Sequence, residues 1–161
     1  MVFHKIEKMF VASADTLYFT VLIHTLQKFK ESMAGKIKLQ LEYILNCSPK
    51  ILFNRLSTAS GLTEWFADDV RVKGNLFTFV WEGTNQDAEK KIHKENKLVR
   101  FEWVGDDMVK DESYFEFIIN QDDLTNDVSL VVLDFVDEDE IEESTSLWDT
   151  QIAKLKQLLG S

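Results

Sequence analysis

The sequence has one cysteine, Cys47, and one proline, Pro49, in 161 residues. A single cysteine excludes an internal disulfide, so the cytoplasm is the expected compartment. Long hydrophobic runs are missing as well, because the most apolar stretch near the start, 17–23, falls far short of the ~18 residues that a membrane-spanning helix needs. That stretch also lacks the preceding basic cluster and the small-residue cleavage site of a secretory signal. We therefore expect a cytoplasmic protein with no membrane-inserted segment.

Basic residues are also scarce. The chain has 18 Lys and Arg against 28 Asp and Glu, a formal net charge of −10, and Lys110 is the only basic residue within 102–143. Non-specific binding to nucleic acids depends on basic side chains that neutralise phosphates, so this surface would repel DNA, RNA and anionic membranes. Nucleic acid is therefore not an expected partner. Solubility is the plainest role for the acidity.

Histidines and glycine-rich loops, which commonly mark metal, nucleophile or nucleotide sites, are few. His93 is the only histidine after residue 32, on an expected exposed strand end among lysines, and with Cys47 it cannot complete a zinc site or a convincing catalytic pair. Cys47 itself stands before a helix start, which could lower its pKa, or it is a half-buried structural thiol. The six glycines are scattered as turn residues. We expect no metal, no cofactor and no catalytic residue.

Residues 1–32 differ from the rest of the chain. After Ser13, a possible helix cap, apolar residues recur at helical spacing over 17–29 and cover much of the helix circumference. Such a helix needs a partner surface, on its own domain or on a second copy as a homodimer. Alternatively, Met33 followed by small residues resembles a natural start, and 1–32 could then precede the native protein. Both interpretations remain open, and 33–161 is the expected domain.

The remaining pattern predicts an α+β domain. Alternation predicts a strand at 37–45, and Ser48 followed by Pro49 predicts a helix start, with a second short helix at 62–66. Strands are then expected at 70–72, 76–82, 86–94, 98–104, 114–120 and 127–136, separated by short turn-rich segments typical of an antiparallel meander. A final helix at 139–159 begins with carboxylates, carries an apolar stripe and ends at Gly160. It is the one element long enough to cover the sheet.

Large aromatic residues follow a two-residue period in these strands. Phe77, Phe79 and Trp81 share one face of their strand, and further columns stand at 99–103 and 115–117. The order of elements, the stretch 61–72 with its Trp-Phe pair, and the motif at 77–83 together resemble the START-like (SRPBCC, Bet v 1-like) superfamily. Within it, the chain looks most similar to small bacterial START-like and activator-of-Hsp90-like domains, over about 36–159.

This resemblance implies a helix-grip fold, in which a curved antiparallel sheet of about six to seven strands wraps around the long C-terminal helix. Members bind hydrophobic molecules such as lipids or sterols in a cavity between sheet and helix, and a minority are cyclases or hydrolases. The activator-of-Hsp90 branch binds a chaperone instead. No catalytic motif of the family can be matched residue by residue.

The aromatic columns and the final helix supply the candidate ligand-binding residues, because ligand sites are mostly apolar. The predicted lining is Tyr43, Trp65, Phe77, Phe79, Trp81, Phe101, Trp103, Phe115, Phe117, Trp148 and Ile152. The alternative is that the same side chains fill the core. Acidic residues near the expected mouth, at 64, 68, 69, 82 and 102, are expected to form a solvated surface.

The sequence therefore predicts a non-enzymatic module that binds a small, lipid-like molecule between sheet and helix. A protein-interaction module, chaperone-associated or self-associating, is the alternative, and a cyclase- or hydrolase-type enzyme ranks third.

Overall fold

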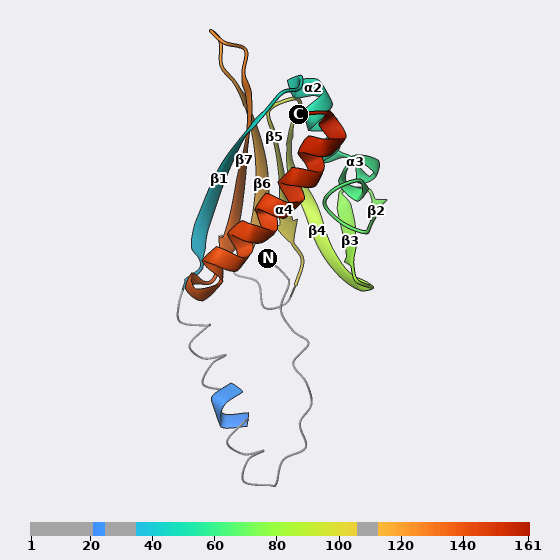
Figure 1. Ribbon diagram of the computed structural model, residues 1–161. Helices are drawn as coiled ribbons and strands as arrows, with labels where there is room; N and C mark the ends of the chain where they lie inside the picture. The colour runs from blue at the N-terminus through green and yellow to red at the C-terminus, as the bar shows by residue number, and fades with distance from the viewer. Residues whose placement is uncertain (1–20, 25–34, 106–112) are drawn as a thin grey trace.

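The computed structural model describes residues 21–24, 35–105 and 113–161. It shows a seven-stranded antiparallel sheet with one long helix lying diagonally across a face (Figure 1). The strands are β1 (Ile37–Leu45), β2 (Asp69–Lys73), β3 (Leu76–Trp81), β4 (Thr84–Lys94), β5 (Leu98–Trp103), β6 (Tyr114–Gln121) and β7 (Val128–Val136). The predicted α+β helix-grip is therefore confirmed.

The sheet is open, with strand order β1-β7-β6-β5-β4-β3-β2. Strands β2 to β7 form a meander, as their short connections predict. The first strand, β1, returns to the far edge and pairs with β7 along its whole length, from Ile37 opposite Val136 to Leu45 opposite Val128. The two edge strands are thus β1 and β2, and the helices α2 and α3 connect them.

Two short helices follow β1. In α2 (Pro49–Ser57), the Ser48 hydroxyl caps the first turn by accepting a hydrogen bond from the Ile51 amide at 3.3 Å, as expected. The second helix, α3 (Ala59–Thr63), begins earlier than the predicted 62–66, because Thr58 caps it through the Gly61 amide. The Trp-Phe pair that was expected inside this helix lies in the turn after it.

The long helix α4 (Ile141–Leu159) follows a single 3-10 turn, η2 (Glu138–Glu140). Acidic side chains occupy the 3-10 turn and the first turn of α4, where they complement the helix dipole. Gly160 ends the helix with φ of 66°, a left-handed conformation that glycine adopts without strain. The Asn46 amide donates to the Ser161 hydroxyl at 2.6 Å, which ties the end of α4 to the turn before α2.

The predicted N-terminal helix lies mostly outside the described residues. Residues 21–24 are helical, and the side chains of Val21, Leu22 and Ile23 are each about half exposed or more. The homodimer expected through this helix therefore stays a prediction. Among the described helices, none is both long and apolar enough to span a bilayer.

Candidate functional site: an aromatic layer under the long helix

The helix-facing side of the sheet is lined by stacked aromatic rings. On β3, the rings of Phe77, Phe79 and Trp81 follow one another with centroids 6.2 Å and 5.6 Å apart. This is the column that strict alternation predicts, since every second residue of a strand shares a face. Phe77 and Phe79 are fully buried, whereas Trp81 is half-buried at the margin of the layer.

Strands β5 and β6 continue the layer. The ring centroids of Phe101 and Phe115 are 5.1 Å apart, and those of Trp103 and Phe115 are 4.8 Å apart. Phe101 also approaches Phe77 of β3 edge-on at 5.0 Å, and Phe117 lies next to Phe115 along β6. The antiparallel register thus brings the predicted columns into direct ring contact. Edge-to-face and offset geometries of this kind stabilise aromatic pairs beyond simple burial.

Phe66 is the residue at the centre of this layer, and the sequence did not single it out as lining. It stands in the turn after α3 and is 2% exposed. Its ring is surrounded by those of Trp65, Phe79, Trp81, Phe115, Phe117 and Trp148. The adjacent Trp65 was predicted, and the Trp-Phe pair was the available signal. The two neighbours share the layer because they lie in a turn, where alternation does not apply.

The cover of the layer comes from one stripe of α4. Trp148, Ile152 and Leu155 recur at helical spacing and are fully buried. The Trp148 ring stacks on Phe66 at 5.7 Å and meets Phe117 edge-on at 5.9 Å. Helix α4 thus covers the aromatic layer together with α2, which packs against β5 and β6.

Two polar contacts fix α4 to the sheet. The Trp148 indole Nε1 donates to Asp134 on β7 at 3.0 Å, and Asp134 is only 3% exposed. Burial raises the pKa of this carboxyl above its ordinary value, and the Trp148 hydrogen bond only partly opposes that effect. Nearer the surface, the Tyr43 hydroxyl of β1 donates to Asp149 at 2.7 Å, and burial together with this carboxylate raises the pKa of Tyr43.

All the predicted lining residues lie in this layer or at its margin. Tyr43, Trp81 and Trp103 are partly buried against the core, and the others are buried within it. Their rings touch one another, so side chains fill the space where the columns meet. The structure therefore places the predicted residues together as a packed layer.

A pocket of about 190 Å³ reaches this layer from the surface. It lies between α4 and the segment that joins α3 to β2, and it is lined by Thr63, Glu64, Trp65, Phe66, Ala67, Asp68, Trp81, Gln151 and Lys154. Three of these nine residues are aromatic and one is alanine, and the other five are polar or charged.

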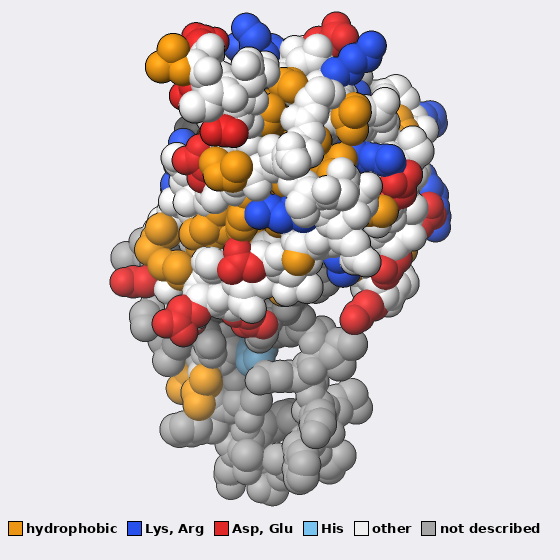
Figure 2. Space-filling view, turned by 45° about the horizontal axis from the view of Figure 1, so that its top comes forward, with side chains coloured by type: hydrophobic (Ala, Val, Ile, Leu, Met, Phe, Trp, Pro, Cys, Tyr) orange, Lys and Arg blue, Asp and Glu red, His pale blue; other side chains and the backbone are white. Residues whose placement is uncertain are grey.

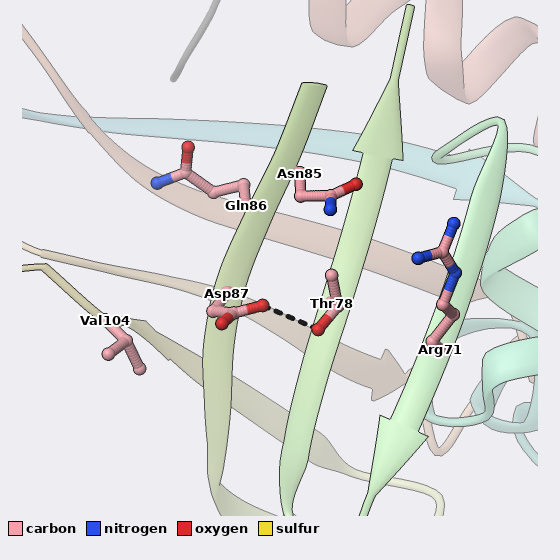
Figure 3. A pocket seen from close by; sticks show the side chains of 6 residues that line it. All are labelled: Arg71, Thr78, Asn85, Gln86, Asp87 and Val104. Atoms are coloured by element: carbon pink, nitrogen blue, oxygen red, sulfur yellow. Dashed lines mark hydrogen bonds between the residues drawn. The ribbon is translucent and has the colours of Figure 1, made fainter. Parts of the chain in front are cut away.

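A larger hollow lies on the opposite face of the sheet. It has a volume of about 510 Å³ and is lined by Arg71, Thr78, Asn85, Gln86, Asp87 and Val104 (Figure 3). The Thr78 hydroxyl donates to Asp87 across neighbouring strands at 2.6 Å. Sequence reasoning missed this hollow because Arg71, Thr78 and Asp87 face outward on neighbouring strands, and in the sequence they have the pattern of ordinary solvated residues.

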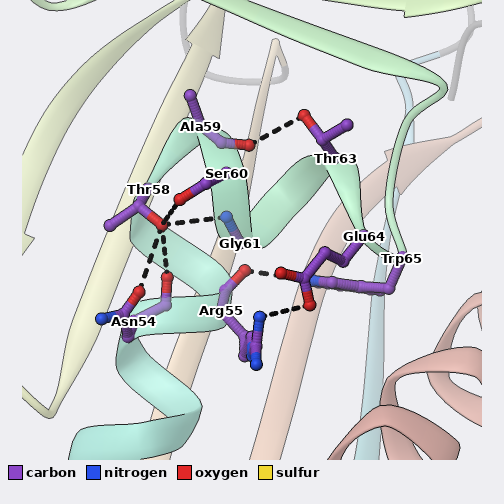
Figure 4. A network of polar contacts seen from close by, with 9 residues as sticks. All are labelled: Asn54, Arg55, Thr58, Ala59, Ser60, Gly61, Thr63, Glu64 and Trp65. Carbon is purple, nitrogen blue, oxygen red and sulfur yellow. Dashed lines mark hydrogen bonds and ion pairs between the residues drawn. The ribbon is translucent and has the colours of Figure 1, made fainter.

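The indoles at the pocket are held by backbone carbonyls. Trp65 Nε1 donates to the Arg55 carbonyl at 3.0 Å, and Trp81 Nε1 donates to the Phe66 carbonyl at 2.8 Å. Figure 4 shows the first of these contacts beside the ion pair between Arg55 and Glu64. The N–H group of each indole thus has a hydrogen-bond acceptor, while its apolar ring packs against neighbouring side chains.

The acidic residues near the mouth have mainly structural partners. Glu64 pairs with Arg55, Asp68 accepts the Glu82 amide at 2.7 Å, and Asp69 pairs with Arg71 at 2.9 Å. These carboxylates are exposed or nearly so, as expected for a solvated surface. In Figure 2, other acidic side chains gather at the lower margin of the described domain, where η2 and the first turn of α4 lie in Figure 1.

The remaining candidates for chemistry are isolated. His93 is exposed on β4, where its ring meets Phe53 at 5.0 Å. Cys47 is half-buried, and burial raises the pKa of its thiol. The alternative of a lowered Cys47 pKa is therefore wrong, because desolvation outweighs any effect of the nearby helix start. Within the described ranges, no cluster of three or more His, Cys, Asp or Glu could hold a metal ion.

An open antiparallel sheet gripping a C-terminal helix over an aromatic layer defines a START-like, helix-grip class of protein. The chain belongs to the START-like superfamily, whose domain matches residues 33–161. No curated protein is significantly similar to it.

Solved structures support the same assignment. The solution structure of BfR322 from Bacteroides fragilis is 35% identical, with 78% of this chain and 92% of that chain covered and a TM-score of 0.57. The Aha1 dimer from Colwellia psychrerythraea is 18% identical over 76% of this chain and 96% of that chain, with a TM-score of 0.64. Protein MLL2253 from Mesorhizobium loti is 17% identical over 77% and 97%, with a TM-score of 0.61. The last two show likeness of fold alone.

Proposed function

We propose that this protein is a non-enzymatic START-like module that binds a small, lipid-like hydrophobic molecule between the sheet and α4. The observation that carries the proposal is the pocket of about 190 Å³ that opens onto the aromatic layer beside Trp65, Phe66 and Trp81. The superfamily to which the chain belongs commonly uses this region for apolar ligands, which supports the same conclusion.

The size of the pocket restricts the ligand. Small-molecule sites usually enclose ~300–1,000 Å³, so about 190 Å³ suits a short apolar chain or one part of a longer one. A larger ligand would have to displace rings of the layer. We expect the ligand to displace α4, because this helix covers the layer through one row of side chains. These side chains are Trp148, Ile152 and Leu155.

The proposed contact residues extend from the pocket into the layer. Trp65 and Trp81 border the opening, and the deeper positions are Phe77, Phe79, Phe101, Trp103, Phe115, Phe117, Trp148 and Ile152, with Tyr43 at the opposite margin. Since Cys47 is a lone free thiol, we also infer a cytoplasmic setting for the module.

The test is native mass spectrometry of the full chain, purified gently, followed by titration with a fluorescent medium-chain lipid probe. We expect an added lipid-like mass and saturable binding. Ala67→Leu fills the pocket, because Ala67 lines it and is 7% exposed, and should weaken binding by about tenfold. Ala153→Leu makes the same change on the exposed side of α4 and should leave binding unchanged. Equal binding by the two variants would argue against this site.

A protein-interaction module is the second candidate. It is favoured by the filled aromatic layer, in which rings contact one another and can serve stability alone. The structure of an Aha1 dimer among the proteins of similar fold is compatible with such a role. Size-exclusion mass of the full chain and of a variant that begins at Met33 separates the self-associating form: a monomer in both cases would exclude a dimer through the N-terminal helix.

A further inference from the structure

Strand β1 is an open edge of the sheet. It stands last in the strand order, next to β7, and its other side has no neighbouring strand within the part of the chain that the structure describes (Figure 1). Every second residue of an edge strand directs its backbone N–H and C=O groups away from the sheet. The edge of β1 is therefore a surface on which another extended strand can form hydrogen bonds.

The backbone of β1 lacks the features that often protect an edge strand. Protected edges are commonly short, bulged or interrupted by proline. Strand β1 has nine residues without proline or glycine, and its register with β7 is continuous. Ile37 and Ile44, near its two ends, are 38% and 62% exposed. A long and regular edge of this kind favours pairing with a second strand.

The charges on β1 are complementary to those of a second copy of the same strand. Charged side chains can block edge pairing, and β1 carries two that are exposed, Lys38 and Glu42, with Gln40 midway between them. If two copies pair antiparallel about Gln40, the Lys38 of each copy lies opposite the Glu42 of the other. The same register places Leu39 opposite Leu41 on the face that packs toward the core.

Other pairings of the edge strands bring like charges together. Antiparallel pairing of two β1 strands about Lys38 or about Glu42 would place that residue opposite its own copy, which destabilises a sheet. The other edge strand, β2, has five residues, and pairing with itself over its whole length would place Arg71 opposite Arg71. Self-association through the edge of β1 about Gln40 is thus the arrangement that the charges favour.

We propose that the β1 edges of two copies of this chain pair antiparallel about Gln40, so that the protein forms a two-fold symmetric dimer with one continuous sheet. The two reciprocal pairs of Lys38 with Glu42 select the register and the partner. This interface is separate from the N-terminal helix and requires no ligand, so it goes beyond the proposed function. Because 37–43 of each copy form a small interface, we expect a weak dimer with a Kd of about 10–100 μM.

The experiment is sedimentation equilibrium of the full chain over a concentration range that spans this Kd. Wild type should change from monomer to dimer as concentration rises. Lys38→Glu and Glu42→Lys each place like charges opposite each other in the dimer and should each raise the Kd by about tenfold. Glu42→Lys also lowers the net negative charge, so an effect of overall charge alone would strengthen association instead.

Two combinations of these variants restore the complementary charges. The double variant Lys38→Glu, Glu42→Lys exchanges the two charges and should dimerise as wild type does. A mixture of the two single variants, one of them isotopically labelled, should form the mixed dimer in native mass spectrometry, because opposite charges then face each other. Lys94→Glu is the control, since it reverses an exposed charge at the end of β4 and should leave the Kd unchanged.

Two results would overturn the proposal. One is a wild-type chain that stays monomeric over the whole concentration range. The other is a dimer that both single charge reversals leave intact, and if removal of 1–32 then abolishes it, the N-terminal helix forms the interface. Neither result bears on the binding of a hydrophobic ligand, which the lipid titration tests separately.

Discussion

The indole of Trp148 donates a hydrogen bond of 3.0 Å to the buried carboxylate of Asp134, joining the middle of α4 to β7 beneath the helix. Both residues are almost inaccessible, at 1% and 3% exposed. This buried polar contact thus helps to fix the position of α4 on the sheet.

Asp134 should make stability depend on pH. Burial raises its pKa in the folded protein, so the native state holds the proton more tightly than the unfolded chain, whose value is about 3.8. Its contribution to the free energy of unfolding is therefore fully present below pH ~3.8 and is lost as pH rises through the folded pKa. Urea denaturation of wild type and Asp134→Asn across this range should show wild type losing stability relative to the variant as pH rises. If the difference in free energy of unfolding between wild type and Asp134→Asn does not change with pH, the raised pKa of Asp134 is contradicted.

The hydrogen bond from Tyr43 to Asp149 should stabilise the attachment of α4 to β1. Its length is 2.7 Å at a partly exposed position, so Tyr43→Phe should lower the free energy of unfolding by about 1 kcal/mol. A double-mutant cycle with Asp149→Ala isolates the pair, because each single variant removes the same contact. Additive effects of the two substitutions would show that the bond contributes nothing.

Phe66 should be the most sensitive position of the aromatic layer. Phe66→Ala removes the ring that packs against Trp148, Phe79 and Phe115, and should lower the free energy of unfolding by about 3–5 kcal/mol. Phe135→Ala is the control. Phe135 is half-buried on the other face of the sheet against Tyr114, so its loss should be clearly smaller. The free energy of unfolding of both variants is measured by denaturant titration. Equal decreases for Phe66→Ala and Phe135→Ala would show that the layer is not centred on Phe66.

Gly61 should tolerate no side chain. A Cβ at this position would lie 2.5 Å from the Asn54 carbonyl oxygen and 2.7 Å from Arg55 Cα, both backbone atoms that cannot move aside easily. Gly61→Ala should therefore cost about 1–3 kcal/mol by overpacking, with α3 displaced from α2. Gly160→Ala is the comparison, because it has a left-handed φ of 66° but open space around it, and should cost about 1 kcal/mol or less. Thermal denaturation of both variants tests whether Gly61→Ala is the more destabilising substitution.

Much of the architecture could be predicted from the sequence because its signals are local. Alternation over Phe77, Phe79 and Trp81 predicted a strand with one aromatic face, and that face is buried. The caps at Ser48 and Gly160 predicted helix ends that the structure confirms. In each case the information lies within a few residues and depends only on backbone geometry.

The site was less predictable because it depends on contacts between distant segments. Phe66 occupies a turn, where no period indicates which way a side chain points, and only the approach of β3, β6 and α4 makes it central. Gln151 falls on the buried side of α4 and reads as one polar residue in an amphipathic helix. Its hydrogen bond to the Phe66 carbonyl joins two positions 85 residues apart, which no local pattern could indicate.

The sequence by itself thus determined the sheet, the gripping helix and the aromatic character of the layer between them, because hydrophobic periodicity specifies which face of each element is buried. The tertiary structure decided that the rings fill much of that layer, and that a small pocket opens beside it. Packing and hydrogen-bond satisfaction depend on the distances between elements, which no local pattern encodes.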